Sequence, residues 1–153
     1  MKITFLGHAT LEIQINEFNL LVDPFISGNP MASNVDLDDL KPDFILITHA
    51  HQDHTLDVEK LAKDNNSLII SNFEIVSHFQ SKGLNGHPMN HGGKWNFDFG
   101  ELKYVNAIHT STFPDGSNGG QPGGFIITSN NKSIYIAGAV SYTHLTLPTI
   151  LLV

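Results

Sequence analysis

The sequence predicts an α/β fold, and two observations carry this prediction. Apolar runs typical of buried strands alternate with helix patterns through the middle of the chain, which indicates helices packed on a sheet. Strand patterns with tight turns flank this region on both sides, as expected for antiparallel strands. The 153 residues contain no repeat and no linker, so we expect one modest domain.

The first strands are expected to form an antiparallel meander. Residues 3–5 are a short strand pattern, and residues 11–15 alternate apolar and polar side chains, as a half-buried strand does. A turn over residues 16–19 leads into a third strand over residues 20–22.

The middle region changes to buried strands and helices. Residues 44–47 and 67–71 are apolar runs that suit strands covered on both faces. Residues 58–62, between them, place apolar side chains at helical spacing, and a second helix is expected after the cap residue Asn72. The inward-facing residues of that helix are expected to be Phe73, Val76 and Phe79.

Hairpin patterns return after residue 86. Residues 95–97 and 101–106 flank a turn, and residues 125–128 and 133–137 predict two more strands. The glycine-rich loop at residues 116–124 matches no phosphate-binding pattern, and we expect it to be mobile near the functional site.

Composition excludes several classes of function. The net charge is −7 and all eight basic residues are lysine, which disfavours a nucleic-acid partner. The absence of cysteine excludes thiolate zinc fingers, iron–sulfur clusters and a cysteine nucleophile. No apolar stretch is long enough to span a bilayer and no signal peptide is recognisable, so we expect a cytoplasmic protein that does not contact membranes.

Nine histidines are present, and four potential metal ligands lie between residues 48 and 54. His49 and His51 are two residues apart in an extended loop, so their side chains point the same way and can share one ion. Asp53 and His54 follow where the chain turns into a helix, so their side chains are directed towards a second, adjacent metal position. Zinc accepts such a set without sulfur, and the alternative is a solvated polar loop that happens to contain histidine.

His109 is the next candidate ligand, because it ends the strand pattern of residues 104–108. At the mouth of a strand it can complete a three-histidine set with His49 and His51 and leave a position for water. The alternative is a hydrogen-bonded histidine at a strand end.

Residues 48–54, with Asp57, resemble the signature of the metallo-β-lactamase fold superfamily, whose members are mostly dinuclear metal hydrolases. Further matching stretches lie at residues 5–9, 22–25, 28–30, 89–93, 97–100 and 123–125. Over about residues 1–138 the chain is similar to a bacterial family of uncharacterised metal-dependent hydrolases related to the lactonase-like branch. The implied fold is an αββα sandwich, of which the chain carries the N-terminal half and part of the second half.

The resemblance also implies roles. His49, His51 and His109 would hold the first metal, while Asp53 and His54 would belong to the second. The implied reaction is attack of a metal-acidified water on a carbonyl or phosphoryl centre, with Asp53 orienting that water or accepting its proton. The expected cofactor is Zn²⁺, with Mn²⁺ or iron as alternatives.

Other polar residues are weaker candidates. His8 reaches the mouth of the site or is structural, and Asp23 supports a ligand or forms a plain turn. Asp57 is expected to support the site from outside or to supply charge at a helix start. His78 is expected at the surface of a helix. We assign neither His87 nor His91 as a ligand.

The chain departs from the family at its C-terminal end. Members continue from the last strand with Gly-Asp, whose aspartate bridges the metals, and add a later histidine, whereas here Gly138 is followed by Ala139. Residues 139–153 include a stretch that resembles an out-of-frame translation of a sequencing adapter, so we interpret residues 1–138 as the hydrolase domain and the rest as a non-native tail. We therefore expect impaired hydrolysis and one bound metal instead of two.

These observations predict a metal-dependent hydrolase of a small ester, lactone or phosphoester. Two alternatives remain open from the sequence: a non-catalytic metal-binding module, and a di-iron redox protein on the same fold. The oligomeric state, the substrate and the identity of the metal are not determined by the residues.

Overall fold

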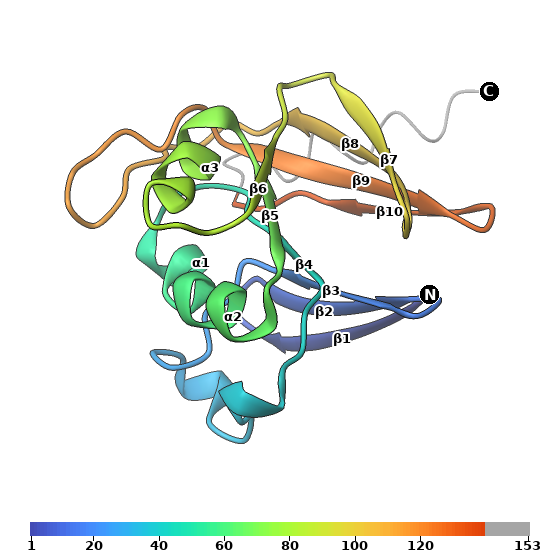
Figure 1. Cartoon of the computed structure of the whole chain (residues 1–153), viewed down its shortest axis with the longest axis horizontal. Helices are drawn as coiled ribbons and strands as arrows, with labels where there is room; N and C mark the ends of the chain where they lie inside the picture. Colours follow the sequence, from blue (N-terminus) through green and yellow to red (C-terminus); the bar gives the residue numbers. More distant parts are fainter. Residues whose placement is uncertain (140–153) are drawn as a thin grey trace.

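The computed structural model describes residues 1–139, which form two β-sheets packed face to face with three helices outside one of them (Figure 1). The six-stranded sheet has the order β1-β2-β3-β4-β5-β6 and the four-stranded sheet the order β10-β9-β8-β7. The strands are β1 (Lys2–Gly7), β2 (Thr10–Ile15), β3 (Phe18–Val22), β4 (Phe44–Leu46), β5 (Leu68–Ser71), β6 (Gly86–Pro88), β7 (Lys94–Phe97), β8 (Gly100–Asn106), β9 (Gly123–Ser129) and β10 (Lys132–Ile136). The helices are α1 (Gln52–Thr55), α2 (Val58–Asn65) and α3 (Phe73–Gln80), with 3₁₀ turns at Pro30–Ala32 and Leu37–Asp39.

The six-stranded sheet lies between two hydrophobic layers. Its first three strands are antiparallel, and β3 to β6 are parallel. In β4, Ile45 packs with the helices while Leu46 packs with the four-stranded sheet, and both are fully buried. The prediction that this strand is covered on both faces is therefore confirmed.

The observed layers are helices, sheet and sheet, as Figure 1 shows. The alternation of buried strands with helices in the sequence correctly predicted the α/β class. Within residues 1–139 all three helices lie on the six-stranded sheet, so the described part of the chain holds three layers of the expected four-layer sandwich. Beyond Ala139, the predicted tail lies outside the described residues.

Three local expectations were wrong. Phe73 is 61% exposed, and the buried positions of α3 are Ile75, Val76 and Phe79, because the cap at Asn72 sets the helix face. Strand β8 confirms the strand expected over residues 101–106, but it ends at Asn106, so the strand pattern of residues 104–108 extends two residues too far. The short parallel strand β6 was missed, since its Gly-His-Pro sequence has no strand pattern.

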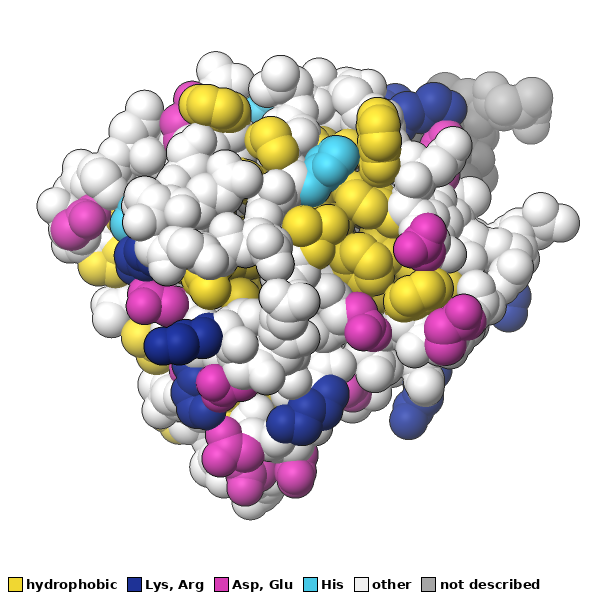
Figure 2. All heavy atoms as spheres, viewed as in Figure 1, with side chains coloured by type: hydrophobic (Ala, Val, Ile, Leu, Met, Phe, Trp, Pro, Cys, Tyr) yellow, Lys and Arg dark blue, Asp and Glu magenta, His cyan; other side chains and the backbone are white. Residues whose placement is uncertain are grey.

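The surface in Figure 2 has acidic and basic side chains interspersed around a cluster of hydrophobic ones. Ring contacts bring together residues of different strands in this protein, such as His87 of β6 with Trp95 and Phe97 of β7. Among the described residues, no helix is both long and apolar enough to cross a membrane.

A buried carboxylate joins the strand ends on which the candidate site is built. Asp23 follows β3 with a positive φ of 46° and has no exposed surface. Its Oδ1 accepts the backbone N–H of Thr48 at 2.8 Å, and its Oδ2 accepts the hydroxyl of Thr48 at 2.7 Å. The same Oδ2 lies 2.9 Å from Nδ1 of His54 on α1. Asp23 therefore fixes the loop after β4 and the helix that follows it.

We expect Asp23→Asn to destabilise the chain by about 2–3 kcal/mol. The new amide nitrogen would face the Thr48 hydroxyl and the His54 N–H, leaving buried donors without an acceptor. The free energy of unfolding, measured with urea in the presence of a chelator, checks this.

The matched control is Asp43→Asn, because the Asp43 side chain is exposed and accepts one backbone N–H from Asn19. We expect that variant to change stability by less than about 0.5 kcal/mol. Equal effects of the two substitutions would contradict the role of Asp23.

Candidate metal centre

The candidate site lies where the parallel strands end. The carboxyl ends of β3, β4 and β5 share one edge of the sheet, so the loops that follow them meet there. The start of β9 reaches the same edge, because the N–H of Gly123 donates to the carbonyl of Thr48 at 2.9 Å. Residues distant in sequence are thereby brought to one place.

Three histidines converge at this edge: His49 and His51 after β4, and His109 after β8. Nε2 of His49 and Nδ1 of His51 are 3.0 Å apart. The ring centroid of His109 lies 4.8 Å from that of His49 and 5.1 Å from that of His51. Zn–N bonds of about 2.0–2.1 Å place tetrahedral ligand atoms about 3.3 Å apart, so the three rings can surround one cation.

Hydrogen bonds with residues outside the cluster leave the ring nitrogens of His49 and His51 that face its centre available to a cation. The hydroxyl of Thr48 donates its hydrogen bond to Asp23, so its oxygen, 3.0 Å from Nδ1 of His49, accepts a hydrogen bond from the N–H at that nitrogen. Nε2 of His49 then keeps its lone pair. Nε2 of His51 lies 3.3 Å from the hydroxyl of Thr110, which leaves Nδ1 of His51 for a cation. Such outer hydrogen bonds are typical of histidines that bind metals.

The electrostatics of the cluster favour neutral imidazoles. Burial, followed by the neighbouring His54, His51 and His109, lowers the pKa of His49 to about 2. Burial and the nearby histidines also lower the pKa of His109. Neutral imidazole is the form that binds a metal, so protons compete weakly for these two side chains near neutral pH.

Asp53 and His54 lie on α1 beside the three-histidine cluster. The ring centroid of His54 is 4.1 Å from that of His49, and its Nδ1 is held by Asp23, which leaves Nε2 available. Asp53 is half-exposed, and its Oδ2 lies 3.0 Å from Nε2 of His8. His8 is thereby placed at the site, and Asp23 supports a candidate ligand instead of forming a plain turn.

The remaining polar candidates lie outside both clusters. Asp57 precedes α2, and its carboxylate accepts the backbone N–H groups of Ile26 and Ser27 at 2.6 and 3.0 Å, so it holds that loop. His78 is half-buried, with its ring stacked on Phe113 at 3.9 Å, although we expected a surface position. His91 lies 2.9 Å from the carbonyl of Pro122 through its Nε2.

Sequence reasoning missed the residues that pin the glycine-rich loop to the site. The hydroxyl of buried Ser111 accepts the N–H of Ala50 at 3.1 Å and donates to the carbonyl of Gly119 at 2.9 Å. Asn72 donates to the carbonyls of Gly119 and Gln121. A Cβ on Gly119 would lie 2.2 Å from that of Ala50, so only glycine allows this approach. The expected location near the site is correct, and these bonds tie the loop down at several points.

The end of the last described strand also reaches the site. A Cβ on Gly138 would lie 2.7 Å from that of Thr48, so the chain passes directly beside the histidine loop. The next residue, Ala139, offers no carboxylate at this point. The donor set of the described residues therefore consists of His49, His51 and His109 at one position and of His8, Asp53 and His54 at the other.

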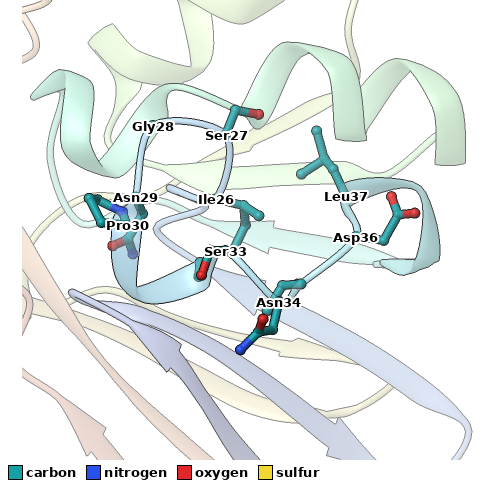
Figure 3. Close-up of a pocket in the computed structure, with 11 residues that line it drawn as sticks. Ile26, Ser27, Gly28, Asn29, Pro30, Ser33, Asn34, Asp36 and Leu37 are labelled. Atoms are coloured by element: carbon teal, nitrogen blue, oxygen red, sulfur yellow. The ribbon is translucent and has the colours of Figure 1, made fainter.

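An open pocket of about 750 Å³ lies in the loop between β3 and β4 (Figure 3). Its lining includes polar side chains such as Asn29, Asn34 and Asp36 and contains none of the six candidate ligands. Phe25, immediately before the pocket residues, contacts the ring of His8 at 5.6 Å between centroids. The pocket is thus a neighbour of the metal site and not the site itself.

Comparison with known proteins identifies the family. The chain matches the model of the beta-lactamase superfamily domain over residues 18–151. It is 59% identical over 144 residues to a UPF0173 metal-dependent hydrolase of Flavobacterium johnsoniae, a match that covers 94% of the chain and 64% of the relative. The chain therefore spans just under two thirds of the length of such curated relatives.

Solved structures agree with this result. Igni18, a metallo hydrolase from Ignicoccus hospitalis, is similar with a TM-score of 0.76 and 28% identity, over 90% of this chain and 60% of that one. The isothiocyanate hydrolase from Delia radicum gut bacteria is similar with a TM-score of 0.72 and 26% identity, over 92% of this chain and 63% of that one. The expected metallo-β-lactamase-type fold is confirmed for part of the full domain. The chain belongs to the beta-lactamase superfamily, and the curated relatives that it resembles are UPF0173 metal-dependent hydrolases.

Proposed function

We propose that this chain carries the metal-binding half of a hydrolase that activates water against a small ester, lactone or phosphoester. The observation that supports this most is the convergence of His49, His51 and His109 from two separate segments onto one point. The outer partners of His49 and His51 leave nitrogen lone pairs free toward that point. Three imidazoles with no thiolate suit Zn²⁺, with Mn²⁺ or iron as alternatives.

The residues of the site have three different roles in the proposed hydrolysis: metal binding, proton transfer and positioning of the ligands. His49, His51 and His109 would hold a divalent cation, which would lower the pKa of a bound water and stabilise negative charge on the substrate oxygen. Asp53 is half-exposed beside this point, and we propose that it orients the attacking water and accepts its proton. Asp23 holds Thr48 and His54, and so keeps the ligands in place.

The proposed substrate is a small molecule with an electrophilic carbon or phosphorus. The acidic, arginine-free chain supports a small-molecule partner over nucleic acid. The similar isothiocyanate hydrolase is named for a substrate with an electrophilic carbon, which supports the same choice. Because Ala139 offers no carboxylate, we propose that turnover by this chain is low and that its first metal binds more tightly than any second one.

We expect His109→Ala to weaken binding of the first zinc equivalent by more than about 100-fold. Removing a ligand costs more than removing the partner of a ligand, which typically costs 10–100-fold. Competition with a chromophoric chelator measures the affinity. His87→Ala is the control, because His87 packs against Trp95 and lies outside both clusters. Unchanged affinity in His109→Ala would exclude the three-histidine site.

Asp53→Ala is expected to lower turnover by about 10²–10⁴-fold while the first zinc equivalent stays bound, since a general base contributes about that factor. The assay compares the zinc-loaded variant with the zinc-loaded parent on a nitrophenyl ester, a lactone, a phosphodiester and an isothiocyanate.

Two results would overturn the hydrolase proposal. Tight zinc binding with no turnover of any of these substrates would favour a non-catalytic metal-binding module. Iron in protein purified without added metal, together with redox activity, would favour the di-iron alternative.

A further inference from the structure

Another open pocket lies where the parallel strands β5 and β6 end, beside the glycine-rich loop. Its volume is about 420 Å³, within the range of about 300–1,000 Å³ that small-molecule sites occupy. None of the six candidate metal ligands lines this pocket, so it is separate from the metal centre. Its lining is polar and consists of Asn72, Glu74, Asn90, His91, Asn118, Gly120 and Gln121.

Hydrogen bonds hold the walls of this pocket in place. The buried side chain of Asn72 donates to the carbonyl of Gly119 at 2.8 Å and to that of Gln121 at 3.1 Å. Its Oδ1 accepts the N–H of Ile75 at 2.9 Å, which fixes the start of α3 against the same loop. Two distant segments therefore keep their relative positions without a ligand, and this lowers the cost of binding one.

The carboxylate of Glu74 lines the pocket without a cationic partner. No ion pair of Glu74 occurs within residues 1–139, and no lysine lines the pocket. A Cβ on Gly120, which has a φ of 69°, would lie 2.5 Å from Oε2 of Glu74. The carboxylate thus lies against the loop backbone at a position where the residue has no side chain to cover it. Its negative charge disfavours an anion in this pocket.

Other side chains of the lining add hydrogen-bond acceptors. Nε2 of His91 lies 2.9 Å from the carbonyl of Pro122, so the neutral imidazole carries its proton on Nε2 and keeps a lone pair on Nδ1. The side-chain amides of Asn90 and Gln121 have no hydrogen-bond partner in the part of the chain that the structure describes. A carboxylate, an imidazole nitrogen and free amides together suit a ligand that donates hydrogen bonds.

We propose that this pocket binds a small amino polyol, a molecule with a primary ammonium group and several hydroxyl groups, and that the ammonium lies on Glu74. An ammonium group only donates hydrogen bonds, so it pairs with the carboxylate and with neighbouring acceptors. Hydroxyl groups donate and accept, as the amides of Asn90 and Gln121 also do. The inference goes beyond the proposed function and does not depend on it, because no metal ligand takes part.

The test is a titration of the full chain with glucamine, a linear amino polyol, followed by NMR of the backbone amides at neutral pH. A chelator is present, so that no bound metal can capture the amine. Sorbitol is the matched probe, because it has a hydroxyl group in place of the ammonium. We expect glucamine to bind at least about 10-fold more tightly than sorbitol, the lower end of what a hydrogen bond to a charged group contributes. The shifts should centre on residues 72–74, 90–91 and 118–121.

Glu74→Gln removes the charge and keeps a side chain of the same size. In this variant we expect glucamine to bind at least about 10-fold more weakly than in the parent, and no more tightly than sorbitol. Glu17→Gln is the matched control, because Glu17 is exposed in the turn between β2 and β3 and the substitution changes the net charge equally outside the pocket. Its affinity for glucamine should equal that of the parent. Thermal unfolding verifies that both variants are folded.

Several results would overturn the proposal. Equal affinity of the parent for the two probes, or binding of neither, would exclude an ammonium site. Unchanged affinity in Glu74→Gln would exclude Glu74 as the partner, and equal weakening in Glu17→Gln would reduce the effect to net charge. Shifts centred on residues 49–54 would place the amine at the metal centre. The three-histidine site is tested separately by His109→Ala, so the two proposals can fail independently.

Discussion

The buried carboxylate of Asp23 is the constraint on which the geometry of the site depends. It sits at the end of β3 and receives the backbone N–H and the hydroxyl of Thr48 together with Nδ1 of His54. Because it accepts the hydrogen bond of the Thr48 hydroxyl, the oxygen of Thr48 is left to accept a hydrogen bond from the N–H of His49. One desolvated carboxylate thus sets the tautomers of two candidate ligands, and low local polarity strengthens each of these bonds.

Much of the site was predictable from the sequence because its main residues are adjacent. The pairing of His49 with His51 follows from alternation in an extended loop, and the turn of Asp53 and His54 into α1 follows the expected helix start. The strands around the site follow from apolar alternation and runs, as in β2 and β4. Alternating and continuous apolar residues can be read directly from the sequence, and this is why these strands could be predicted.

The remaining parts depend on contacts between distant segments, which leave no periodic signal. Ser111 is a short polar residue among others, yet it links Ala50 to the glycine-rich loop. His8 reaches Asp53 because Gly7 and His8 adopt positive φ values, and no pattern in the sequence predicts those values. The exposure of Phe73 and the strand at Gly86–Pro88 were misjudged for a similar reason, since packing partners and not local propensity determine them.

The most direct test of this account is X-ray absorption spectroscopy of the chain loaded with half an equivalent of zinc, so that the tighter position fills first. Three imidazole nitrogens at about 2.0–2.1 Å, with a light oxygen or nitrogen atom completing the shell, are the predicted result. A shell dominated by oxygen, or one with a single imidazole, would contradict the convergence of His49, His51 and His109 on a shared cation.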